Sequence, residues 1–140
     1  MLTTSEIGDI LYRFCKELSV KDVRREWNFG KGEAVTERVV IAVKSLTHGR
    51  TWSKAFAEVN VCVPDLTDGD ADLIRLSELE KEYTAAFGRN VGELNGARFR
   101  FARESSSLLD DSQLRLHYVN IRVQFEYLNF VEQWHSKFQQ

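Results

Sequence analysis

The stretch RVVIAVKSLTHGRTWSKAFAEVNVCVPDL, residues 38–66, decides the fold of this 140-residue chain. Residues 38–46 are rich in β-branched side chains, and residues 52–63 alternate apolar with polar side chains, a pattern typical of β-strands. Between them, residues 47–50 contain a glycine and predict a turn. Because strands joined by so short a link pair antiparallel, the stretch predicts a β-hairpin that ends at Pro64.

An amphipathic helix is predicted on each side of this hairpin. Residues 4–18 carry apolar side chains at the three-and-four spacing of a helix, behind a capping box. After an acidic loop at residues 65–72, whose last aspartate is a natural helix cap, leucines and aromatic residues recur at the same spacing as far as Gly88. Each helix therefore has one apolar face to bury against the sheet.

A second hairpin and a short helix are predicted in the C-terminal part. Residues 98–103 alternate phenylalanine with arginine, residues 105–112 form a polar connection, and residues 119–126 alternate apolar with polar side chains. Residues 127–138 place their apolar side chains within one arc of a helical wheel, which predicts a short C-terminal helix.

These elements predict a single α+β domain spanning residues 1–140. The order α-β-β-α-β-β plus a short C-terminal helix predicts a four-stranded, mainly antiparallel sheet with two main helices packed on one face. Residues 21–33 and 88–96 are assigned to loops, because no hydrophobic period runs through them. The predicted core residues are Val39, Ile41, Val43, Val59, Val61, Leu76, Leu79, Phe99, Val119, Ile121 and Val123.

No set of residues has the spacing of a catalytic or metal site. Cys15 and Cys62 lie in apolar periodic segments, which predicts buried thiols rather than a disulfide or metal ligands. The three histidines share no ligand spacing, residues 30–33 lack the pattern of a phosphate-binding loop, and residues 65–72 depart from the calcium-loop template. We therefore predict no catalytic residues, no cofactor and no bound metal, and a protein that is not an enzyme.

Charge and hydropathy restrict the partners further. The 19 Lys and Arg against 21 Asp and Glu give a net charge of -2, without the basic excess of a dedicated duplex-binding protein. No apolar run approaches the roughly 20 residues that cross a bilayer, and the first ten residues carry no basic targeting region. The sequence predicts a chain that stays in the cytoplasm unless an assembly carries it elsewhere.

The opening stretch, together with DGDADLIRLSELEKEY (residues 68–83) and LRLHYVNIRVQFEYLNF (residues 114–130), resembles the small tail-terminator or tail-completion proteins of long-tailed phages and prophages. The likeness lies in element order and sequence texture and spans residues 5–129. It implies a structural protein that forms a ring, usually a hexamer, which caps the tail tube and joins it to the head connector.

The resemblance also implies the partners and the location. The partners would be further copies of the chain, the tail tube protein and the head-tail connector protein, with neither a membrane nor a specific nucleic acid among them. The location would be the virion tail, and the cytoplasm of the bacterial host during assembly.

A ring requires an interface in which one patch binds a different patch on the next copy. The candidate sources of such patches are the unpaired outer strands of the sheet and two segments without a hydrophobic period, residues 21–33 and 89–95. Trp27 is the predicted aromatic anchor, with the alternative that it covers the end of the first helix. The predicted interface residues are Trp27, Phe29, Arg89, Asn90, Arg98 and Arg100.

Two other functions stay open on the sequence. One is a small nucleic-acid-binding or regulatory module with salt-dependent affinity. Its binding residues would be Arg98, Arg100, Arg103, Arg115 and Arg122. The other is a small α+β hydrolase, which would require a concave pocket with convergent polar groups.

Overall fold

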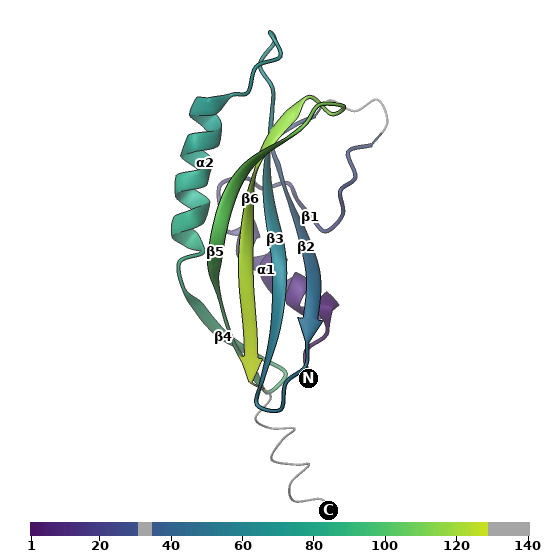
Figure 1. The fold of residues 1–140 in the computed structure, drawn as a ribbon, viewed down its shortest axis with the longest axis vertical. Helices are drawn as coiled ribbons and strands as arrows, with labels where there is room; N and C mark the ends of the chain where they lie inside the picture. Colours follow the sequence, from purple (N-terminus) through teal and green to yellow (C-terminus); the bar gives the residue numbers. More distant parts are fainter. Residues whose placement is uncertain (31–34, 129–140) are drawn as a thin grey trace, which may run out of the picture.

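Six strands form one mixed sheet that curls into a half-barrel, with the order β1-β2-β3-β6-β5-β4 (Figure 1). The computed structural model describes residues 1–30 and 35–128. Neighbouring strands are antiparallel except β1 and β2, which are parallel. In chain order the elements are α1 (Thr4–Lys16), β1 (Val23–Arg24), β2 (Arg38–Thr47), β3 (Trp52–Pro64), α2 (Leu73–Ala86), β4 (Asn90–Leu94), β5 (Ala97–Asp111) and β6 (Leu116–Leu128).

The predicted four-stranded sheet and the order α-β-β-α-β-β are wrong. The described chain runs α-β-β-β-α-β-β-β, and the sheet is six-stranded and mixed. β1 lies in the segment 21–33 and β4 in the segment 88–96, both of which the sequence predicts to be loops. Residues 105–112 are not a polar connection either, since β5 continues to Asp111.

β4 is joined to β5 by a tight turn at Asn95 and Gly96, both with positive φ angles of 52° and 80°. An Asn-Gly pair is the strongest short-range signal for such a hairpin. Within β4, a Cβ atom on Gly92 would lie 2.4 Å from Cζ of Phe99. The glycine that made the segment look like a loop is therefore what lets the Phe99 ring lie against the strand.

The second half of β5 pairs on one side only within the described residues. Ser106 stands opposite Ile121 and Leu108 opposite Val119 on β6, whereas β4 ends its pairing at Phe101. Residues 104–110 are exposed, so the acidic and serine side chains among them are compatible with a strand. Pairing with β6 overrides the low strand propensity of this run.

Both helices pack on one face of the sheet and share one main core. Every predicted core residue except Val43 and Phe99 is buried there, and those two are partly buried against it. The capping box of α1 is confirmed, with the Glu6 amide donating to Thr3 Oγ1 at 3.1 Å. Asp72 caps α2 by accepting from the Arg75 amide at 3.2 Å.

A second, smaller core lies on the opposite face of the sheet. Its buried residues are Phe29, Val40, Cys62 and Leu116. Arg38 is only 2% exposed, with its guanidinium 4.4 Å from the centre of the Phe29 ring and Nη1 donating to the Asn28 carbonyl at 3.1 Å. Its Nε lies 3.7 Å from the Asp22 carboxylate. These contacts tie the segment after α1 to the sheet.

The predicted C-terminal helix is wrong at its start, because Tyr127 and Leu128 belong to β6. β6 pairs with β3 as far as Leu128, which stands opposite Trp52. The strand therefore includes the first two residues of the segment 127–138, whose apolar spacing also fits a helix. The remainder of that prediction, residues 129–138, lies outside the described residues, as do residues 31–33.

Candidate interface

The six predicted interface residues fall into separate places on the molecule. Arg89, Arg98 and Arg100 come together around the link from α2 to β4 and the first half of β5. Trp27 belongs to the second core region on the opposite face of the sheet from the helices. The structure thus divides one predicted interface into two distinct surfaces.

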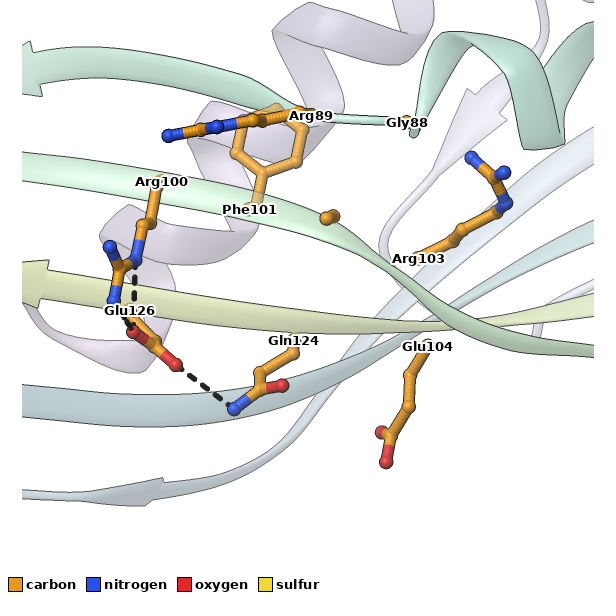
Figure 2. A pocket seen from close by; sticks show the side chains of 9 residues that line it. Gly88, Arg89, Arg100, Phe101, Arg103, Glu104, Gln124 and Glu126 are labelled. Atoms are coloured by element: carbon orange, nitrogen blue, oxygen red, sulfur yellow. Dashed lines mark hydrogen bonds and ion pairs between the residues drawn. The ribbon is translucent and has the colours of Figure 1, made fainter.

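Two adjoining hollows, of about 400 Å³ and about 520 Å³, share Arg89 and Arg100 in their walls. Figure 2 shows the first of them, beside the end of α2 and across β5 and β6. We call the combined surface the arginine groove. The residues that define it here are Trp52, Arg89, Val91, Arg98, Arg100 and Arg103.

Strand alternation on β5 positions two of these arginines. Arg98 and Arg100 are exposed, whereas Phe99 and Phe101 point to the helix side and pack with the main core. Arg100 is held in place, since its Nη2 and Nε lie 2.6 Å and 3.0 Å from the same oxygen of Glu126. Gln124 donates to the other oxygen of that carboxylate at 3.0 Å (Figure 2).

An aromatic residue from a different strand completes this part of the groove. The Trp52 ring, on β3, lies 4.4 Å from the Arg100 guanidinium in a cation–π contact. Trp52 is 36% exposed and Val91, on the edge strand β4, is 73% exposed. The groove therefore offers apolar surface beside its charges.

The groove carries positive charges that the described chain does not neutralise. The side chains of Arg89 and Arg98 are exposed and form no hydrogen bond or ion pair within residues 1–30 and 35–128, although Glu93 stands opposite Arg98 on the neighbouring strand. Arg103 donates to the carbonyl of Thr84 at the end of α2. Glu126 is engaged by Arg100, and Glu104 lies 3.1 Å from Arg122 on the neighbouring strand. The remaining carboxylate in the lining is that of Glu93.

Sequence reasoning missed Trp52 as part of this surface, placed Val91 only within the candidate segment 89–95, and named Arg103 only for the alternative nucleic-acid surface. Trp52 lies on β3, which is separated from β5 by β6 in the sheet, so no spacing along the chain brings Trp52 to Arg100. The Asn-Gly turn was the available signal for β4, and recognising it would have placed Val91 on an edge strand beside Arg100.

Trp27 packs on aromatic neighbours at the second core. Its ring centre lies 5.1 Å from that of Phe29 and 5.0 Å from that of Tyr118. Phe29 is only 5% exposed, so it belongs to the core, while Trp27 is 41% exposed. Asn90 is also engaged within the chain, since its side-chain amide donates to the Ala86 carbonyl at 2.9 Å and holds the link from α2 to β4.

A third hollow, of about 630 Å³, lies between the acidic loop and the turn from β5 to β6. In its wall His117 Nδ1 is 2.6 Å from Asp65 Oδ1. Ser112 lines the same hollow but makes no hydrogen bond with His117 among the described residues. A Ser-His-Asp hydrolase needs a nucleophile within hydrogen-bond reach of its base, and this arrangement lacks that link.

Other reactive chemistry is scarce in the described part of the chain. Burial raises the pKa of both thiols, Cys15 and Cys62, to about 12, which keeps them protonated at neutral pH. Within residues 1–30 and 35–128 no group of three or more His, Cys, Asp or Glu could hold a metal ion. Among the described helices none is long and apolar enough to cross a membrane.

The five arginines of the predicted nucleic-acid surface do not share one face. Arg115 has a positive φ of 53° in the turn from β5 to β6, away from the arginine groove. Arg122 lies on the exposed face of the sheet with Arg98 and Arg100, but its charge is already engaged by Glu104 and its guanidinium stacks 4.3 Å from the Phe56 ring. A continuous phosphate-binding track would require these side chains on one surface.

No family model matches the chain, and no curated protein matches it. A solved structure is similar in fold, with 16% sequence identity, a TM-score of 0.54, and coverage of 88% of this chain and 91% of that chain. The name of that protein states no activity, ligand or partner. At this level of identity the likeness shows the fold alone.

Proposed function

We propose that the chain is a structural ring subunit of the tail-terminator kind, which caps the tail tube of a phage or prophage and joins it to the head connector. The sequence resemblance supports this proposal, and the arginine groove is the observation that carries it. The groove combines exposed apolar side chains with two arginines, Arg89 and Arg98, whose side chains form no ion pair within the described residues. Aromatic and arginine side chains are enriched in protein-binding surfaces.

The charge of the groove also determines how copies of the chain can associate. Two identical grooves facing each other across a two-fold axis would bring Arg89 and Arg98 against like charges, which opposes association. Binding of the groove to a different patch on the next copy avoids this repulsion. Such a heterologous contact produces a ring when its rotation closes, and a filament when it does not.

In this proposal the protein is not an enzyme, and its partners are its own copies, the tail tube protein and the head-tail connector protein. It acts in the virion tail and, during assembly, in the bacterial cytoplasm. Neither a membrane nor a specific nucleic acid is a partner. The ring is a hexamer, as the resemblance implies.

Mass measurement in solution tests this function. Light scattering coupled to size exclusion, at micromolar concentration and low salt, should show one assembly of fixed copy number, and electron microscopy should show closed rings. Addition of short tail tubes from the same phage should place rings at tube ends. A strict monomer under all these conditions would overturn the proposal.

The same samples separate the two alternative functions. A nucleic-acid-binding module would stay monomeric and bind an oligonucleotide with an affinity that falls steeply with salt. A hydrolase would turn over ester or amide substrates and lose that activity on Ser112→Ala or His117→Ala replacement.

A further inference from the structure

We infer that the arginine groove of one copy receives the acidic loop, residues 65–72, of the next copy. The inference rests on the proposed function, because it names the partner of the surface proposed to bind a neighbour. Opposite charges and exposed apolar side chains on the two surfaces favour this contact between copies.

The acidic loop projects from the sheet between β3 and α2 (Figure 1). Asp68 and Asp70 are exposed, and neither forms an ion pair with a described residue. The loop has a fixed shape, since the Leu66 carbonyl accepts from the Gly69 amide at 2.9 Å and Asp68 Oδ1 accepts from the Asp70 amide at 2.9 Å. The carboxylate charges are thus presented outward on an ordered turn.

The loop also carries an apolar side chain beside its charges. Leu66 is 48% exposed, next to the two aspartates. The arginine groove has the complementary composition, with Trp52 and Val91 exposed beside Arg89 and Arg98. An apolar centre within a charged rim is the usual composition of a protein interface. Opposite charges in the two rims would favour this pairing over groove-to-groove contact.

The two surfaces cannot meet within one chain. The acidic loop lies at one end of the long axis, whereas β4 and the first half of β5 lie in the other half of the molecule (Figure 1). α2 runs between them, from the loop at its start to Arg89 just after its end. The contact must therefore join two copies head to tail, which is the heterologous geometry that a ring requires.

Charge reversal tests the contact in the full chain. The groove variant Arg89→Glu/Arg98→Glu and the loop variant Asp68→Lys/Asp70→Lys should each stay monomeric where the wild type assembles, with affinity lowered at least ~100-fold by like-charge contacts. Mixing the two variants should restore assembly, because each reversed groove then meets a reversed loop. Assemblies from the mixture should contain both variants in equal numbers.

The control variant is Arg13→Glu/Lys81→Glu, which changes the net charge by the same amount as the groove variant on exposed basic side chains of α1 and α2 that form no ion pair with a described residue. It should assemble like the wild type, and all variants should unfold like the wild type in high salt. If either reversal variant alone forms the same rings as the wild type, this contact is refuted while the proposed ring function is not. A wild type that never assembles would overturn both. Assembly that fails to return on mixing, or a monomer whose groove binds an oligonucleotide, would also overturn the contact.

Discussion

Replacement of Trp27 by alanine measures what holds the segment after α1 on the sheet. Trp27 is 41% exposed, so about six-tenths of a side chain that covers roughly 150–250 Å² is hidden, or about 90–150 Å². At about 25 cal/mol per Å², this area corresponds to a loss of about 2–4 kcal/mol of unfolding free energy relative to an extended unfolded chain. The replacement also uncovers Phe29, which packs on the buried Arg38.

The assay is urea unfolding followed by far-ultraviolet circular dichroism, in high salt so that charge-based association is weakened. The matched control is Trp52→Ala, because Trp52 is 36% exposed and loses a similar area. We expect both replacements to lower stability by a similar amount, with the assembly mass unchanged for Trp27→Ala and association weakened as well for Trp52→Ala. A loss below about 0.5 kcal/mol, the size of a surface substitution, would refute the reasoning. Lost association with unchanged unfolding would assign Trp27 to the interface.

Three further measurements test the core. Raising the pH from 7 to 10 in reductant should lower stability, because an unfolded thiol with a pKa of 9.0 loses its proton while the buried one, with a pKa of about 12, keeps it. At pH 10 this effect lowers the unfolding free energy by about 1.4 kcal/mol for each of Cys15 and Cys62. The variant with both cysteines replaced by alanine should therefore lose ~3 kcal/mol less than the wild type between pH 7 and pH 10. An equal loss in the two proteins would refute thiol burial. Ile121→Ala should cost about 2–5 kcal/mol in urea unfolding, and a loss under about 0.5 kcal/mol would contradict its placement. Tyr83→Phe removes the acceptor of the Val20 amide and should cost about 1–3 kcal/mol in the same assay, whereas unchanged stability would show that water replaces it.

The elements that the sequence predicted well are those whose pattern is produced by a single buried face. β3 alternates because Ala57, Val59 and Val61 face the main core, and α2 is recognisable because Leu76 and Leu79 recur on one face. The hairpin of β2 and β3 and both helices therefore follow from local pattern. Their ends differ from prediction by one or two residues, as fraying ends usually do.

The missed elements depend on partners far away in the chain. β1 has only two residues, and it is a strand because Val23 pairs with Val39 on β2. The serine-rich half of β5 is exposed and depends on β6 for its pairing. The same limit applies to the arginine groove, where Trp52 and Arg100 meet across an intervening strand. Residue spacing along the sequence does not predict which residues become neighbours across different strands.

The position of β6 in the sheet has a kinetic consequence. Its partner β3 is synthesised much earlier, and α2, β4 and β5 lie between the two strands in the sequence. Pro64 can pair with Leu116, and Trp52 with Leu128, only after these elements have been synthesised. Contacts of such long sequence separation make folding slow, because closing the long intervening loop costs chain entropy before the new contacts compensate for it. On the ribosome, the hairpin of β2 and β3 waits with an open edge, and this nascent edge is exposed to aggregation until the final strand arrives.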